Sequence, residues 1–121
     1  MSKGVNGFPR CYRLITKSSY QQVFSKPKRV STPELLFLFS SNNQTESRLG
    51  LAIAKKQIPR AVDRNRVKRL VRESFRHQRQ EIISQDIVVM ARKSLLNMDN
   101  TQVRSQLDKL WRQVIRKGSS A

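Results

Sequence analysis

Residues 48–76 read RLGLAIAKKQIPRAVDRNRVKRLVRESFR, and they join a short apolar strand pattern to a strongly basic helix pattern. In 48–55, large residues alternate with small ones, which predicts a strand with one face that packs side chains and one that permits close backbone approach. Pro59 suits the first turn of a helix, because its missing N–H has no intrahelical partner there. We therefore predict a helix from about 59 to 83 directly after this strand.

The predicted helix is divided lengthwise into an apolar side and a charged side. At about 100° per residue, Val67, Leu70 and Val71 fall on one arc and the cations fall elsewhere. The predicted cationic face comprises Arg64, Asn65, Arg66, Lys68, Arg69, Arg72 and Arg76, and Lys55 and Lys56 extend it from the end of the strand. Such a face is either simply solvated or binds phosphates. Like charges four residues apart cost about a few tenths of a kcal/mol per pair, so phosphate oxygens are a suitable source of compensation.

Asn65 leaves a similar choice open. It is either a polar residue near the start of the helix or a contact to a base edge or sugar hydroxyl, because its amide has both donors and an acceptor.

Apolar patterns on both sides of this region predict the other elements of a sheet. Upstream, 16–25 favours a short amphipathic helix, 29–31 an edge strand and 34–40 a buried strand. Downstream, 86–93 favours a strand, and apolar residues from Val103 to Ile115 recur at helical spacing after a candidate cap at Asp99 or Asn100. The order α-β-β-β-α-β-α predicts an α/β fold, an α+β two-layer arrangement in which helices pack on a single sheet of about four strands.

The charge of the chain indicates a polyanionic partner. The 121 residues include 25 Lys and Arg against 8 Asp and Glu, a net charge of +17. Because such a field opposes compaction, RNA, DNA or an anionic membrane would explain it. The longest apolar runs are far shorter than the roughly 20 residues of a membrane-spanning helix, and the N-terminus has no apolar run typical of a secretory signal. We therefore expect no membrane insertion and a cytoplasmic location.

The side chains that carry chemistry in most enzymes are sparse. One cysteine, Cys11, and one histidine, His77, exclude an internal disulfide and a Cys/His zinc cluster. The acidic residues are scattered, and no Gly-rich phosphate loop is present. We identify no catalytic residue and no metal ligand, so a nuclease containing this chain would need another component for its chemistry.

Residues 48–76 resemble the protein subunit of bacterial ribonuclease P, whose hallmark is an Arg-Asn-Arg element in a helix that follows a strand and a Lys-Lys pair. Here the element is Arg64-Asn65-Arg66. The segments SSYQQVF, DIVVMARK and LDKLWRQV are similar to other parts of the family, so the resemblance covers about 14–116. We accordingly expect a flexible basic arm over 1–13, a ribonuclease P protein-like domain over 14–116 and a flexible tail over 117–121.

This resemblance implies a fold feature and a function that periodicity cannot show. The fold would contain a left-handed βαβ crossover, against the usual right-handed rule. The chain would be a cofactor of a catalytic RNA subunit that removes the 5′ leader of precursor tRNA with magnesium ions. It would not be active alone, would require no further protein partner, and would contact the RNA subunit through the Arg-Asn-Arg helix.

The resemblance also implies a cleft between the first helix and the sheet that holds the 5′ leader. Single-stranded RNA is held by aromatic rings that stack on bases and by cations that follow the backbone. The predicted cleft residues are Tyr20, Phe24, Phe37, Arg13, Lys17 and Arg29. Phe37 depends on a strand register that one residue of slip would reverse, and Phe39 is predicted to lie in the core.

Two other functions are compatible with the composition. A structural RNA-binding protein, such as a ribosomal component, would have the same size and charge. A nuclease active without RNA is disfavoured by the scattered carboxylates.

Overall fold

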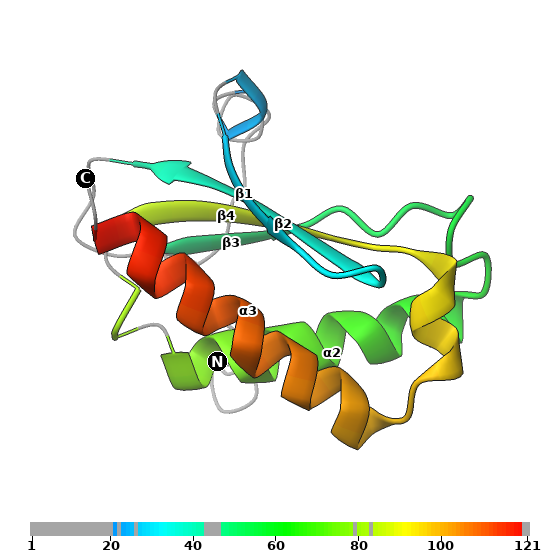
Figure 1. Cartoon of the computed structure of the whole chain (residues 1–121). Coiled ribbons are helices and arrows are strands. Elements are labelled where there is room, and N and C mark those ends of the chain that lie inside the picture. The colour runs from blue at the N-terminus through cyan, green and yellow to red at the C-terminus, as the bar shows by residue number, and fades with distance from the viewer. Residues whose placement is uncertain are drawn as a thin grey trace, which may run out of the picture.

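The computed structural model describes residues 21, 23–25, 27–42, 47–78, 80–82 and 84–119, and it contains one four-stranded sheet with two long helices. The elements are β1 (Lys28–Ser31), β2 (Leu35–Ser41), β3 (Arg48–Leu51), α2 (Ala61–Gln78), β4 (Gln85–Ala91), the 3-10 helix η2 (Lys93–Asn97) and α3 (Asn100–Ser119) (Figure 1). Residues 21 and 23–25 are also helical. The predicted order of elements and the single sheet are confirmed.

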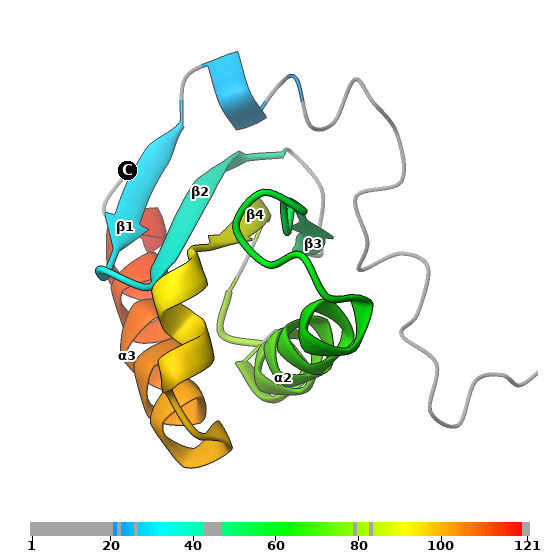
Figure 2. The same ribbon diagram turned by 90° about the vertical axis from the view of Figure 1, so that its right-hand side faces the viewer.

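The strand order is β1-β2-β4-β3, so β4 lies between two strands that precede it in sequence. β1 and β2 form an antiparallel pair, β2 and β4 another, and β3 is parallel to β4. Figures 1 and 2 show that α2 carries the chain from the end of β3 beneath the sheet to the start of β4. With both strands pointing toward the viewer in Figure 2, β4 lies to the left of β3 above α2, and this crossover is left-handed.

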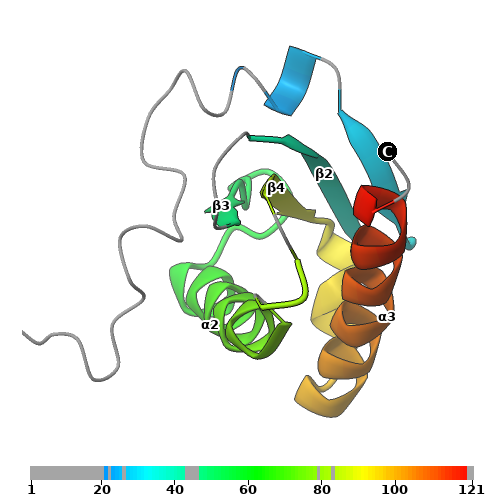
Figure 3. The same ribbon diagram turned by 90° about the vertical axis from the view of Figure 1, so that its left-hand side faces the viewer.

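The core lies between the sheet and the pair α2 and α3, which cover the same face (Figure 3). This inner face carries alternate residues of β2, including Phe37 and Phe39, which are fully buried. Trp111 of α3 packs against Phe37 and Phe75, with ring centroids 4.5 and 5.5 Å apart. Its indole Nε1 donates to the Ser74 hydroxyl at 2.7 Å, so the buried polar end of the ring has a partner.

Several predicted boundaries differ from the structure. The strand predicted over 48–55 ends at Leu51, and residues 55–57 form a turn before α2. The helix predicted over 59–83 ends at Gln78 and is followed by a turn in which Glu81 N–H donates to the Gln78 carbonyl. α3 continues through Ser119, into the segment predicted as a tail.

The start of α3 is capped as predicted. The Asp99 carboxylate accepts from Gln102 N–H at 2.8 Å, and the Gln102 side chain accepts from Asp99 N–H at 2.9 Å. This reciprocal pair is a capping box, which satisfies two donors at the helix terminus.

Candidate nucleic-acid interface

The exposed side of α2 carries a strip of cationic and polar side chains. Val67, Leu70 and Val71 are buried against the rest of the domain, which confirms the predicted apolar arc. Asn65, Arg69, Arg72 and Arg76 are all exposed on the opposite side. In the described part of the chain, the side chains of Asn65, Lys68, Arg69 and Arg76 have no ion pair or hydrogen bond. These four side chains are thus available to an anionic partner.

Arg66, by contrast, connects α2 to the beginning of α3. Its Nε donates to the Asn100 side-chain oxygen at 2.7 Å, and its Nη2 donates to the Met98 carbonyl at 2.8 Å. These bonds employ two of the five N–H donors of the guanidinium, so the remaining donors can still meet a phosphate. Arg66 therefore has a structural role that its place among the predicted RNA-binding residues did not suggest.

Arg64 holds the segment that leads into the first turn of α2. Its Nη1 donates to the carbonyls of Ile58 and Pro59 at 3.0 and 2.7 Å. Lys55 and Lys56 are exposed in the turn before this segment, and Lys68 is half-buried on the helix. The predicted cationic residues thus share one region of the molecule, but the two arginines of the Arg-Asn-Arg element are also held by the protein itself.

The outer face of the sheet, opposite α2 and α3, is only partly covered. The strand register places Arg29 beside Leu38, and Leu38 beside Val88. Val23, from the helical residues 23–25, is fully buried in the cluster that contains Val88, and Leu38 and Met90 of this cluster are only partly buried. Phe24 remains 46% exposed next to it in sequence. This face therefore combines apolar surface with at least one cation, and an exposed aromatic ring lies on the segment that packs against it through Val23.

Phe37 does not belong to this face, and its prediction as a cleft residue is wrong. It is paired with Val30 and Val89 on the inner face, and its side chain is fully buried against Trp111. An RNA base cannot stack on a ring without accessible surface. Phe39 is buried as predicted. Tyr20, Arg13 and Lys17 lie outside the described residues.

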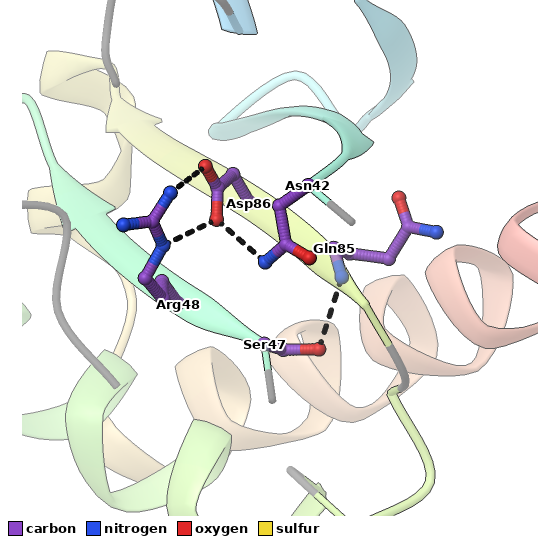
Figure 4. Close-up of polar contacts among 5 residues, drawn as sticks. All are labelled: Asn42, Ser47, Arg48, Gln85 and Asp86. Carbon is purple, nitrogen blue, oxygen red and sulfur yellow. Dashed lines mark hydrogen bonds and ion pairs between the residues drawn. The ribbon is translucent and has the colours of Figure 1, made fainter. Parts of the chain in front are cut away.

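A buried ion pair stands at one end of the outer face. The Asp86 carboxylate is 1% exposed, and it accepts from Arg48 Nε at 2.8 Å, Arg48 Nη2 at 2.7 Å and Asn42 Nδ2 at 2.8 Å (Figure 4). The hydrogen bonds to Asp86 raise the pKa of Arg48 above its ordinary value. Ser47, next to Arg48, donates to the Ile82 carbonyl and accepts from Gln85 N–H at 3.3 Å. These contacts hold β3, β4 and the end of β2 together.

Sequence reasoning missed this ion pair. The one available signal was an aspartate at the start of an otherwise apolar strand pattern, 86–93, which requires a buried partner if the strand is central. Across the residues that the structure describes, no group of three or more His, Cys, Asp or Glu is placed to hold a metal ion.

Comparison with known proteins agrees with these features. The family described as Ribonuclease P matches residues 8–115. The chain belongs to this family. It is 51% identical over 110 residues to the ribonuclease P protein component of Histophilus somni strain 2336, covering 91% of this chain and 92% of that protein. It is 46% identical over 105 residues to that of Escherichia coli O157:H7, covering 87% and 88%.

Solved structures of the family share the fold. The RNase P protein of Staphylococcus aureus matches with a TM-score of 0.75 and 29% identity, over 81% of this chain and 90% of that one. The RNase P protein of Thermotoga maritima matches with a TM-score of 0.74 and 33% identity, over 84% and 96%.

These relatives confirm the prediction of a ribonuclease P protein component, with an RNA partner and a place in tRNA processing. They give no support to the ribosomal alternative. No helix in the described ranges is long and apolar enough to cross a membrane.

Proposed function

We propose that this ribonuclease P protein binds the catalytic RNA subunit through the cationic strip of α2, and the 5′ leader of precursor tRNA through the outer face of the sheet. The RNA subunit carries out the cleavage. The protein supplies positive charge and a surface for the leader, has no activity alone and works in the cytoplasm without a further protein partner.

The exposed strip of α2 is the observation that carries this proposal. From Asn65 to Arg76 it extends about 16 Å at a rise of about 1.5 Å per residue. The buried arc fixes the helix on the sheet, so the arginines are presented from a rigid element. Rigid presentation lowers the entropy cost of binding, and arginine's planar fork suits phosphate oxygens.

The outer face supports the second contact. Phe24 follows Val23, which packs on this face, and offers an exposed ring. Arg29 is paired with the partly buried Leu38 on the face itself. An aromatic ring and a cation that follows the backbone are the usual elements of a surface for single-stranded RNA. Tyr20, Arg13 and Lys17 are proposed to complete this surface.

Magnesium ions are proposed to act on the RNA rather than in a protein site. RNA phosphates and water are suitable oxygen ligands for magnesium, which keeps much of its hydration shell. The cations of α2 would complement these ions by neutralising further phosphates.

Reconstitution tests this function. The purified protein is mixed with the cognate RNA subunit and a precursor tRNA at low magnesium, and 5′ cleavage is followed. We expect cleavage with both components and none with the protein alone. Cleavage that does not depend on the added protein would contradict the function.

A charge-matched comparison tests the surface. Arg69→Ala with Arg76→Ala removes two cations from the strip, whereas Arg92→Ala with Arg112→Ala removes two exposed cations outside α2. We expect only the first pair to weaken binding of the RNA subunit strongly and to reduce the salt dependence by about 0.7–0.9 per lost phosphate contact. Equal losses for both pairs would show that net charge, rather than α2, determines binding.

A further inference from the structure

α2 and α3 line an open pocket on the side of α2 next to the cationic strip. Its volume is about 290 Å³, and Leu70, Glu73, Ser74 and His77 of α2 and Arg104 and Asp108 of α3 line it. This size is near the lower end of the range for small-molecule sites. It suits a single ring system rather than a long chain.

The lining has an apolar part and a polar part. Leu70 and Ser74 are buried, and the Ser74 hydroxyl is held by the Trp111 indole at 2.7 Å. The pocket is thus built on rigid core residues. Glu73 and Asp108 are half-buried, and Arg104 is exposed.

The two carboxylates are unusual in a chain with a net charge of +17. In the described ranges, neither Glu73 nor Asp108 forms an ion pair, although Arg104 lines the same pocket. A carboxylate accepts hydrogen bonds only. A ligand for this pocket therefore offers N–H donors to the carboxylates and an acceptor to Arg104.

We propose that this pocket binds an unpaired guanine base of RNA. Guanine presents two adjacent N–H donors, N1–H and the N2 amino group, on its Watson–Crick edge, and its O6 acceptor lies beside them. The two oxygens of one carboxylate can accept from both donors. Adenine and cytosine present one amino group next to an acceptor, and uracil presents one N–H between two acceptors.

The position of the pocket favours a base that is part of RNA. Glu73 lies on α2 between Arg69 and Arg76 in sequence, at the edge of the exposed strip. An RNA strand that runs along those arginines could place one unstacked base in the pocket. Proteins commonly recognise unpaired RNA bases in this way, by hydrogen bonds to the Watson–Crick edge.

This inference rests on the proposed function only in that the chain contacts RNA, and its test needs neither the RNA subunit nor tRNA cleavage. The probes are fluorescent ten-residue oligouridylates that carry guanosine, inosine, adenosine or cytidine at one central position. Inosine is the critical probe because it lacks only the N2 amino group of guanosine. Dissociation constants are measured by fluorescence anisotropy at one salt concentration with the full-length protein.

We expect the guanosine probe to bind about five- to tenfold more tightly than the other three, as expected for one added hydrogen bond to a half-exposed charged group. At least one of the variants Glu73→Gln and Asp108→Asn should reduce the ratio of dissociation constants towards one. Glu81→Gln is the matched control, since it removes one negative charge at an exposed residue outside the pocket. It should strengthen binding of all four probes slightly and leave the preference intact.

Equal affinity of the wild-type protein for the four probes would overturn the inference. So would a preference that Glu73→Gln and Asp108→Asn leave unchanged while both variants retain the wild-type thermal unfolding curve. Failure of tRNA cleavage together with a retained guanosine preference would reject the proposed function and leave the pocket assignment standing.

Discussion

Replacing Arg48 with methionine removes the guanidinium from the buried Asp86 carboxylate and retains much of the aliphatic stem. Asp86 then keeps only the hydrogen bond from Asn42, while its exposed fraction of 1% leaves it without water. Breaking a buried pair by removing one partner costs about 3–5 kcal/mol. We expect the free energy of unfolding of Arg48→Met to fall by an amount in this range.

Replacing the other partner of the ion pair should lower the free energy of unfolding by a smaller amount. Asp86→Asn leaves a guanidinium whose side chain is 24% exposed, so water can replace part of the lost interaction. The amide oxygen can still accept one of the hydrogen bonds. We expect a loss of about 1–3 kcal/mol. The double variant should be more stable than Arg48→Met alone, because a buried neutral amide costs less than a buried unpaired carboxylate.

Urea denaturation provides the assay. Trp111 is the only tryptophan of the chain and is fully buried, so its fluorescence reports loss of the core. Arg60→Met is the control, since the Arg60–Asp63 pair is 3.9 Å apart and the Arg60 side chain is 77% exposed. A surface pair of this kind contributes about 0–1 kcal/mol. A loss for Arg48→Met no larger than that for Asp86→Asn, or additive losses in the double variant, would refute the reasoning.

The other predictions separate surface from core. Arg66→Ala should lower the free energy of unfolding by about 1–3 kcal/mol, because Met98 and Asn100 lose their donor. Arg69→Ala should change the free energy of unfolding by less than about 0.5 kcal/mol and weaken RNA binding. Equal stability of the two variants in urea would contradict the connecting role of Arg66. Phe75→Ala, on the buried side of α2 and outside the pocket, should cost about 3–5 kcal/mol, with RNA binding lost only in proportion to unfolding, and a fully stable variant that cannot bind RNA would reverse the two faces of α2. Phe24→Ala should weaken binding of precursor tRNA to the assembled enzyme and spare mature tRNA, and Phe37→Ala should instead lower stability by about 3–5 kcal/mol; a Phe24→Ala variant with equal losses for both tRNAs would show that this ring does not contact the leader.

The local periodicity of apolar residues was sufficient to predict the helices and strands and, for most of them, which face is buried. The spacing of Val67, Leu70 and Val71 predicted which side of α2 is buried, and the pattern ending at Ile115 predicted α3. In such helices the apolar stripe is wide, so a boundary error of a few residues leaves the buried face unchanged.

Contacts between residues that are distant in sequence could not be predicted from the local pattern. Phe37 lies in a nearly uniform apolar run, where a period of two gives no signal for the face that the helices cover. The Arg66 partners Met98 and Asn100 lie more than 30 residues downstream. Their approach depends on how α2 and α3 pack, which the helix pattern alone does not specify. The left-handed crossover followed only from the family resemblance.

The central position of β4 has a consequence for synthesis of the chain. β4 is made after β1, β2, β3 and α2, yet it alone joins β2 to β3. In a nascent chain that ends before Gln85, the β1–β2 hairpin is the only strand pair of this sheet that can form, and an isolated hairpin is marginally stable in water. The domain therefore completes its fold late, when β4 and then α3 have left the ribosome. Prematurely terminated products should remain unfolded and be degraded by proteases, so the cell would hold few partial copies able to occupy the RNA.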